Sequence, residues 1–540
     1  MITIPFKHLN FNTNAPNSGY WDQHFLSEIL SSPPYIEILD DSACHHCIVI
    51  VPGRQNVDYV ENINSYINEK FGKVLVIITG DEESIFPVNE LNHLDMKIWL
   101  QTPKAGVSYP NVIKFFGVGT TPHTDLLSST IPEKKLNWFY SGQANHQRRN
   151  DMINELKKRN DGYLNVSSGF SLGLEPAVYI ENMYNAKVIP CPSGAFTPDT
   201  FRFYEALETG CIPIADEVST LNRNSGYWQM LYGQDIPFPT FDDMLILNNK
   251  IDHCLTNYTK YANKIFAWWQ LYKREFKQDL LNSLVPTTST SGITVVIPTS
   301  PTTTNPDTSI IEETISTVRH HLSKSEIIIT FDGVRPEQED LRANYEEYTR
   351  KLLWLCNKSE GMLPIVFDEH MHQTGMLREA LKYVNTNKIL YVEHDTPLTP
   401  DCEINWDSVN AMIDNNDADL IKFSFESHIL DIHRHLVLDK TPKSMYNDQY
   451  IRTIQWSQRP HVASTEFYKR ILRDHFSDSA KSFIEDKMHG IVAEAYKHEQ
   501  LQGWNKYKIW MYHPEGNNIK RSYHLDARGN SSKFDNTQIF

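Results

Sequence analysis

Cysteine is scarce in this sequence of 540 residues, which contains only 7 cysteines, scattered thinly along the chain. An odd and sparse set does not form the disulfide framework that is typical of small secreted domains. Residues 44–47 read Cys-His-His-Cys, which resembles half of a zinc site, but no second pair of ligands follows at a usable spacing. A zinc site there stays an open alternative, and we expect a cytoplasmic protein.

Long apolar runs and an excess of positive charge are also absent. No stretch of about 18 apolar residues occurs, so we expect no membrane span. The start, MITIPFKHLNFNTNAPNSGYW, lacks the basic region and apolar stretch of a secretory signal. The formal net charge is −16, shared equally as −8 between residues 1–290 and the rest. Proteins that grip a nucleic-acid backbone usually show a basic stripe, so DNA is an open but not a favoured partner.

The length exceeds what one hydrophobic core usually organises, so we expect two to four domains. From about residue 35, short apolar runs alternate with polar windows of helical pattern; the runs include HCIVIVPG, KVLVIITGD, MKIWLQTP and NVIKFFGVG. Strands separated by ten or more residues predict a parallel sheet with crossover helices. The sequence therefore predicts an α/β protein with a first Rossmann-like layer over residues 1–125, in which residues 1–30 are irregular.

A second α/β segment follows this layer. Its first strand, Trp138–Ser141, opens into a turn at Gly142, and a helix that starts near His146 carries Arg148 and Arg149.

A later strand, residues 188–191, leads through a turn into a helix that carries Arg202 and Glu205. The two residues are three apart, so they share one face of the helix. They could form an ordinary surface ion pair or take part in a site.

The segment PSGAFTPDTFRFYEALETGCIPIADE, with Tyr184 and Pro190 ahead of it, resembles the signature of exostosin-type glycosyltransferases. The resemblance covers about residues 135–220. It implies a GT-B fold, in which two Rossmann-like domains bind a sugar nucleotide in the cleft between them.

Carried over by position, this resemblance implies that Glu205 holds the donor ribose. It also implies that Arg202, with Arg148 or Arg149, faces the diphosphate. The chemistry agrees, because a carboxylate accepts hydrogen bonds from ribose hydroxyls and guanidinium groups fit phosphate oxygens.

The second half of the chain repeats the alternation of strands and helices after a polar stretch, VPTTSTSG, which is suited to a linker. A strand at 293–297 breaks at Pro298 and Thr299, and a second strand ends at Asp332. The buried strand in KILYVEHDTPL ends in Glu393, His394 and Asp395.

Acids at the carboxyl end of a buried strand lie at the edge of an α/β sheet where ligands bind. Two oxygen ligands one residue apart, here Glu393 and Asp395, can share a Mg²⁺ or Mn²⁺ ion with a diphosphate. An ordinary acidic turn after a strand is the alternative.

VIPTS, FDG and the strand that ends in Glu393-His394-Asp395 resemble, in this order, the family 2 glycosyltransferases of GT-A type. The resemblance implies that Pro298, Thr299 and Asp332 hold the nucleobase and ribose of a donor. It implies a metal bound where the family usually shows DxD, with Asp395 the better ligand and Glu393 the weaker one.

A turn at Gly375 would lead into a helix that directs Arg378 at the same site. His524, near the C-terminus, would complete the metal shell and fits better than His513 because of its polar context.

HVASTEFYKRIL resembles the acceptor-side segment of this family, and SFIEDKMHGIVAEA resembles its ED motif at a helix start. The resemblance implies that Asp486, beside Glu485, is the general base that takes the proton of the acceptor hydroxyl. Acids at this place could also simply complement the helix dipole.

The expected organisation is therefore a Rossmann-like layer over 1–125, an exostosin-like nucleotide-sugar-binding domain over 126–284, a linker over 285–292 and a GT-A-like mixed α/β domain over 293–540. The expected function is transfer of a sugar from a nucleotide-sugar donor to a glycan or other hydroxyl-bearing acceptor. We expect the C-terminal module to use Mn²⁺ or Mg²⁺ and to invert configuration, and the N-terminal module could hold a second site.

Three alternatives stay open. The chain could be a sugar-binding or scaffolding protein with a degenerate N-terminal module, or a sugar transferase that acts on modified DNA bases. The third alternative is a nucleotidyltransferase. Such an enzyme usually opens with a Gly-rich basic loop after its first strand, and VVIPTSPTTTNP has neither glycine nor a basic residue, which counts against it.

Overall fold

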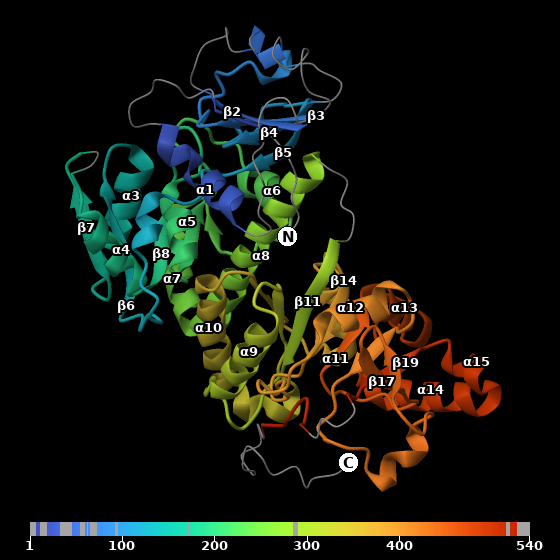
Figure 1. Cartoon of the computed structure of the whole chain (residues 1–540). Coiled ribbons are helices and arrows are strands. Elements are labelled where there is room, and N and C mark those ends of the chain that lie inside the picture. The colour runs from blue at the N-terminus through green and yellow to red at the C-terminus, as the bar shows by residue number, and fades with distance from the viewer. Residues whose placement is uncertain are drawn as a thin grey trace. The chain divides into compact units, whose positions relative to one another are not determined.

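The structure is a computed structural model that describes residues 7–10, 19–32, 46–53, 60–61, 63–64, 73–91, 96–169, 172–284, 290–514 and 519–525. The chain divides into two compact units, Met1–Thr287 and Thr288–Phe540, which run from blue to yellow-green and from yellow-green to red in Figure 1. Each unit contains sheets with parallel strands, so the prediction of an α/β protein is confirmed.

The described residues of the first unit form two five-stranded sheets, in which every pair of neighbouring strands is parallel. The first sheet has the order β1 (Lys7–Asn10), β2 (His46–Pro52), β3 (Lys73–Thr79), β4 (Met96–Gln101) and β5 (Val112–Phe116). The second has the order β10 (Thr240–Phe241), β9 (Ile212–Asp216), β8 (Ala186–Cys191), β6 (Leu136–Gln143) and β7 (Tyr163–Ser167).

Helices connect and cover these strands. They are α1 (Gly19–Ser31), α3 (Gln147–Leu156), α4 (Pro176–Tyr184), α5 (Phe201–Glu208), α6 (Tyr227–Tyr232), α7 (Leu247–Thr256), α8 (Tyr258–Leu284) and the short 3₁₀ helices η1 (Val88–Glu90), η2 (Pro122–Leu126) and η3 (Met244–Ile246). The long helix α8 packs against β3 of one sheet and β9 of the other, so it is shared by both.

Helix α1 corrects the prediction that residues 1–30 are irregular. Phe25, Leu26 and Ile29 lie on one face of the helix and are buried. Phe25 stacks on Trp269 of α8, with 5.6 Å between ring centroids. The polar, Asn-rich composition hid this narrow apolar face, whose burial comes from a helix about 240 residues further along the chain.

In the second unit, the part of the chain that the structure describes forms one nine-stranded mixed sheet. Its order is β13 (Met362–Val366), β12 (Ile327–Phe331), β11 (Thr290–Thr299), β14 (Thr386–Tyr391), β18 (His461–Ser464), β15 (Leu420–Lys422), β19 (Ile509–Tyr512), β17 (Asp448–Arg452) and β16 (Lys443–Met445). Residues 285–289 of the predicted linker lie outside the described residues, and residues 290–292 already belong to β11.

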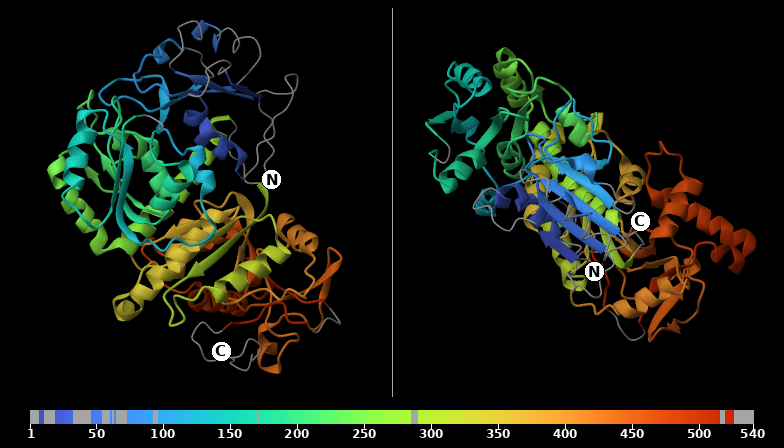
Figure 2. Two further views of the ribbon diagram at one scale, coloured as in Figure 1. Left: turned by 90° about the vertical axis from the view of Figure 1, so that its left-hand side faces the viewer. Right: turned by 90° about the horizontal axis from the view of Figure 1, so that it is seen from above.

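Helices cover both faces of this sheet, as Figures 1 and 2 show. They are α9 (Ser309–His321), α10 (Arg342–Lys358), α11 (His372–Ala380), α12 (Trp406–Asp414), α13 (Thr465–His475), α14 (Ile484–Glu499), α15 (Leu501–Trp504) and the 3₁₀ helices η4 (Pro336–Leu341) and η5 (Asp431–Leu436). Helix α11 packs on β11 and β12, and α13 packs on β14 and β18. None of the helices in the described part of the chain is both long and apolar enough to cross a membrane.

Strand direction decides which loops meet. Strands β11, β12 and β14 are parallel to one another. Strand β18 is antiparallel to both β14 and β15, so β15 runs in the direction of β14, and β19 is parallel to β15. Strand β13 is parallel to β12, and β16 runs in the direction of β19 because β17 is antiparallel to both. The carboxyl ends of these seven strands therefore lie at one edge of the sheet, which we call the carboxyl edge of the second unit.

Candidate functional site

Two of the predicted donor-binding residues, Pro298 and Thr299, end β11 at this carboxyl edge, and both are buried. The Thr299 hydroxyl donates to the carbonyl of Thr330 over 3.0 Å. The carbonyl of Thr299 in turn accepts from the amide of Asp332 over 3.1 Å. The structure therefore buries both residues at the end of β11 and uses the polar groups of Thr299 within the chain.

Asp332 follows β12 and is 3% exposed. Its carboxylate accepts hydrogen bonds from the amides of Gly333 (2.9 Å), Met371 (2.6 Å) and His372 (3.1 Å). The Nδ1 atom of His370 lies 2.8 Å from its Oδ2. A carboxylate has about four acceptor positions, so groups of the chain itself occupy those of Asp332.

This arrangement changes the role that the sequence predicts for Asp332. A side chain at Gly333 would place its Cβ 2.2 Å from the carbonyl carbon of Glu369, so the close approach of these two loops requires glycine. Asp332 then holds the segment 370–372 in place, which includes His372 with its left-handed φ of 57°. We assign Asp332 to positioning rather than to direct ribose binding.

The predicted metal ligands follow β14. Burial, together with the charges of Asp395 and Glu485, raises the pKa of Glu393 to about 8. The Nε2 atom of His524 lies 3.5 Å from Oδ2 of Asp395, and the amide of Leu525 donates to the Asp395 carbonyl over 2.7 Å. Residues near the C-terminus are thus held beside the acids at the end of β14.

One glutamine connects these acids to the start of α14. Gln373, 5% exposed, donates from Nε2 to Oε1 of Glu393 over 2.6 Å. Its own Oε1 accepts from Nε2 of Gln458 (2.6 Å) and from the amide of Ile484 (3.3 Å). The amide of Gln458 donates to Oε2 of Glu485 over 2.8 Å. Glu393 and Glu485, 92 positions apart in the sequence, thereby belong to one hydrogen-bond network.

The two acids of the predicted ED motif differ in environment. Burial raises the pKa of Glu485, which is half-buried, although the amide of Gln458 and the charge of Lys422 oppose this shift. Asp486 is exposed, and its charge acts on His372. The network therefore incorporates Glu485, while Asp486 lies at its border.

Two expectations about α11 are wrong. Gly375 lies inside the helix and is buried, so it does not form a turn. Arg378 donates from Nη1 to the carbonyl of Asp478 (2.9 Å) and from Nη2 to that of Ser477 (3.1 Å). Arg378 therefore joins α11 to the segment after α13.

A divalent cation suits the donors at the end of β14. Among the described residues, no three His, Cys, Asp or Glu side chains form a complete metal-binding group. Asp395, Glu393 and His524 make a partial set of hard oxygen and imidazole donors, as is usual for Mg²⁺ or Mn²⁺ sites that substrate phosphates and water complete. After burial, the charges of Asp395 and Glu485 raise the pKa of Glu393, and a bound cation would offset both effects.

The sequence does not reveal Gln373, Gln458 or Arg459. The Nη1 atom of Arg459 is buried without a partner among the described residues, and its charge acts on Glu393. Neutral glutamines and a lone arginine carry no short-range signal, since only the folded sheet brings them to the acids.

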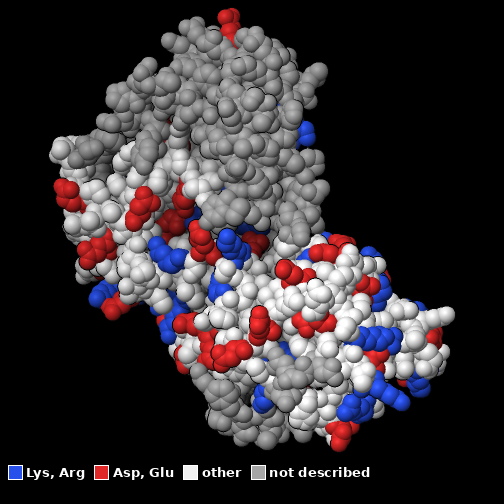
Figure 3. Space-filling view, in the orientation of Figure 1, with Lys and Arg blue, Asp and Glu red and all other residues white. Residues whose placement is uncertain are grey.

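The surface of the second unit carries both signs of charge. On the face that Figure 3 shows, the described Lys and Arg residues are interspersed with Asp and Glu rather than gathered into a wide basic patch. This distribution does not favour a nucleic-acid backbone as partner on that face.

The first unit holds a separate polar cluster around Glu205, which is 3% exposed. Glu205 accepts from the hydroxyls of Thr121 (2.7 Å) and Tyr179 (2.8 Å), and Nδ1 of His123 lies 3.4 Å from its Oε1. Burial alone would raise its pKa, but these hydrogen bonds outweigh burial and lower the pKa. Glu205 is therefore a buried, ionised acceptor with about one free position, and not part of a surface ion pair.

Two arginines lie near this cluster, since the charge of Tyr179 acts on both. Arg202 donates from Nη2 to the carbonyl of Ser141 over 2.6 Å and lies over the ring of Tyr140. Its charge lowers the pKa of Arg149, after the larger effect of burial. The Nε atoms of both arginines and the Tyr140 hydroxyl are buried without a hydrogen-bond partner among the described residues.

Glycine keeps this space open. A Cβ atom at Gly142 would lie 2.6 Å from Nη2 of Arg202 and 2.9 Å from the Tyr140 hydroxyl. Two neighbouring guanidinium groups with unused donors form an arrangement that suits an anion such as a diphosphate.

Arg148 does not belong to this arrangement. It is 5% exposed and forms a bidentate ion pair with the buried Asp216, in which its Nε atom donates over 2.6 Å. Its Nη2 also donates to the carbonyl of Asp242 over 3.0 Å. Of the two arginines left open by the sequence, only Arg149 can face a phosphate.

In the Cys-His-His-Cys pattern, residues 44 and 45 lie outside the described residues, and Cys47 is buried in β2.

No protein-family model and no curated protein matches this chain. Solved structures that resemble it include Staphylococcus aureus TarS 1–349 with UDP-GlcNAc, at 13% identity over 46% of this chain and 61% of that chain, with a TM-score of 0.27. The mannosyltransferase PcManGT from Pyrobaculum calidifontis with GDP-Man and Mn²⁺ has 13% identity over 49% of this chain and 65% of that one, with a TM-score of 0.26. The bifunctional IspDF from Campylobacter jejuni has 12% identity over 43% and 52%, with a TM-score of 0.23. This chain thus covers less than two thirds of each, and such low TM-scores do not assign a function.

Proposed function

We propose that the second unit transfers a sugar from a nucleotide-sugar donor to a hydroxyl group of an acceptor. The observation that carries this proposal is the network that joins Glu393 through Gln373 and Gln458 to Glu485. It sets acids with two different tasks, cation binding and proton removal, beside one another at the carboxyl edge of the sheet.

Asp395, Glu393 and His524 would hold the divalent cation. When bound, the cation neutralises the charge that develops on the departing diphosphate. Gln373 fixes the orientation of Glu393, and Asp332 holds the segment 370–372 against the site.

Glu485 is the general base in this proposal. It would accept the proton of the acceptor hydroxyl as the oxygen attacks the anomeric carbon, and its raised pKa brings it closer to the operating pH, where general bases are most effective. A single displacement with the acceptor opposite the leaving diphosphate inverts the configuration. The exposed Asp486, which the family resemblance favours, becomes the comparison residue.

The test is release of nucleotide from UDP-, GDP- and ADP-sugars by the full chain in the presence of Mn²⁺. We expect slow hydrolysis of at least one donor, with loss on chelation and a fall of at least about 100-fold in Asp395→Ala. Asp401→Ala is the matched control, because Asp401 is an exposed acid in the loop that follows the same strand.

Hydrolysis that survives Asp395→Ala would refute the proposed site. If a donor binds and none of the donors tested releases its nucleotide, the alternative of a sugar-binding protein is favoured.

A second nucleotide-sugar site in the first unit is a further candidate, favoured by the unpartnered Nε atoms of Arg149 and Arg202 beside Glu205. These guanidinium groups would bind the diphosphate, and Glu205 would accept one ribose hydroxyl. We expect Arg149→Gln and Arg202→Gln each to weaken binding of inorganic pyrophosphate about tenfold. Unchanged pyrophosphate binding in both variants would remove this site.

A further inference from the structure

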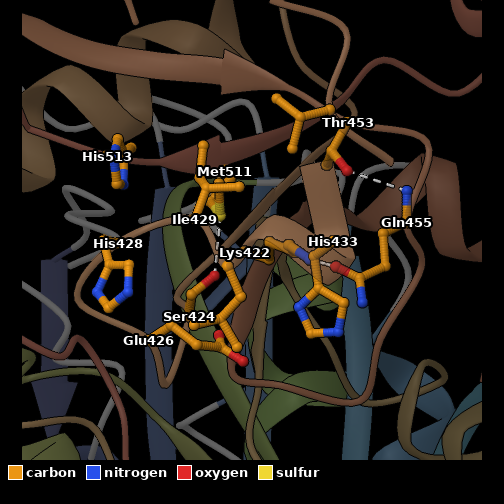
Figure 4. A pocket seen from close by; sticks show the side chains of 12 residues that line it. Lys422, Ser424, Glu426, His428, Ile429, His433, Thr453, Gln455, Met511 and His513 are labelled. Carbon is orange, nitrogen blue, oxygen red and sulfur yellow. Dashed lines mark hydrogen bonds between the residues drawn. The ribbon is translucent and has the colours of Figure 1, made fainter. Parts of the chain in front are cut away.

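A pocket of different chemistry lies at the same carboxyl edge, where β15 and β19 end (Figure 4). Its lining includes Lys422, Glu426, His428, His433 and His513. The cavity volume is about 30 Å³, which is room for two or three water-sized atoms, such as the oxygens of a carboxylate or phosphate.

Lys422 gives the pocket a fixed donor. The residue is 4% exposed, and its ammonium group donates to Oε1 of Gln455 over 2.5 Å. An ammonium group carries three N–H donors, so two more can serve a ligand. Burial lowers the pKa of Lys422 to about 8 while the charges of Glu426 and Glu485 oppose this shift, so the amine is mostly protonated at pH 7.

The acid in the lining has a second cation beside it. Oε1 of Glu426 lies 3.9 Å from Nη2 of Arg459, so its charge is shared between Arg459 and Lys422. His428, His433 and His513 add imidazole nitrogens, and Figure 4 shows His428 and His513 on one side of Lys422 and His433 on the other. N–H groups from three separate segments can therefore converge on one small anion.

We propose that this pocket binds an oxyanion, a carboxylate or a phosphate, carried by the acceptor. The proposal rests on the proposed function, because it takes the pocket as part of the acceptor site. Proximity supports this placement, since the charge of Glu485 acts on Lys422. An acceptor whose anionic group lies in the pocket would have a hydroxyl held near the general base.

The test compares sugars of one scaffold that differ in charge. Binding of glucose, glucuronate and glucose 6-phosphate to the full chain is measured by titration calorimetry without any nucleotide sugar. We expect at least one anionic sugar to bind about tenfold more tightly than glucose. Glucuronate and glucose 6-phosphate distinguish a carboxylate from a phosphate ligand.

Variants attribute this preference to the pocket. Lys422→Gln and His433→Ala should each reduce it to about twofold or less, because each removes a charged or imidazole donor. His435→Ala should keep the full preference, since His435 is exposed on the same 3₁₀ helix but is not in the lining. Circular dichroism checks that the variants fold. If the variant at the buried Lys422 does not fold, the result for His433→Ala decides the test by itself.

Equal affinity for the three sugars, or a preference that His433→Ala leaves intact, would overturn the proposal. The outcome is separate from that of nucleotide release. Hydrolysis of a donor without an oxyanion preference refutes only the pocket. A preference without hydrolysis of any donor supports an oxyanion site while the transferase proposal fails.

Discussion

The side chain of Gln373 holds that of Glu393 at the end of β14: the Nε2 amide donates to Oε1 over 2.6 Å. Glu393 belongs to the acids at the end of a strand, whereas Gln373 belongs to α11. The Oε1 atom of Gln373 also accepts a hydrogen bond from the amide of Ile484 at the start of α14. One buried amide thus sets the spacing between two acidic segments. Its loss should affect both stability and chemistry.

Replacement of this amide is the first prediction. Gln373→Ala leaves Glu393 without its donor and Gln458 without its acceptor, so the free energy of unfolding should fall by about 2 to 3 kcal/mol. The rate of donor hydrolysis should fall at least about tenfold, since the acids lose their fixed spacing. Urea denaturation and nucleotide release measure the two effects.

Lys382→Ala serves as the control for Gln373→Ala. Lys382 follows the same helix, is exposed and forms only a surface ion pair with Glu379, so its loss should cost less than about 1 kcal/mol. A Gln373→Ala variant as stable and as active as Lys382→Ala would show that the amide does not organise the site.

The second prediction separates the two acids of α14. Glu485→Gln should keep donor binding and lower transfer by about 100-fold or more, because a general base contributes roughly that much or more. Asp486→Asn should change transfer less than about threefold, since Asp486 is exposed and lies outside the network. Single-turnover rates with saturating donor measure the step. The reverse result would return the base to Asp486, as the family resemblance implies.

The third prediction separates two adjacent arginines of the first unit. Arg148→Gln leaves the buried Asp216 without its cation and should lower the free energy of unfolding by about 3 to 5 kcal/mol. Arg149→Gln should change it by less than about 1 kcal/mol, because Arg149 faces another guanidinium and relief of their repulsion offsets the lost contacts. Urea unfolding of both variants is the measurement, and equal losses would contradict the distinction.

The fourth prediction concerns pH. Burial raises the pKa of Asp199 to about 6, although the amide of Val118 and the hydroxyl of Tyr227 donate to it. In the unfolded chain the pKa of an aspartate is about 3.9. Because the folded state binds the proton of Asp199 more tightly, this group's contribution to stability is complete below that pH and is lost as the pH rises through the folded pKa.

Asp199→Asn removes this titration. From pH 5 to pH 8, the stability of the variant relative to the original chain should rise by about 1.4 kcal/mol. Denaturation at both pH values tests it, with an exposed acid such as Asp401 replaced by Asn as control. A difference between the chains that does not change with pH would mean that Asp199 titrates normally.

Particular residues show how far the sequence could predict the site. The order of strands that end in Asp332 and Asp395 was visible, because buried strands are continuous apolar runs and acids interrupt them. The roles of Arg148 and Arg378 were not visible, because an arginine that faces a phosphate and one that faces a buried aspartate or a carbonyl have the same local sequence. Gln373 gave no signal, since an amide acts only through the groups that surround it.

The sequence by itself determined the α/β class, since the alternation of apolar runs and helical windows is a local property of the chain. The tertiary structure alone decided which acids share a network, because strand order and direction bring β12, β14 and the start of α14 to one edge of a sheet. It also decided which charged groups are available for a ligand, because availability depends on hydrogen-bond partners that come from distant segments.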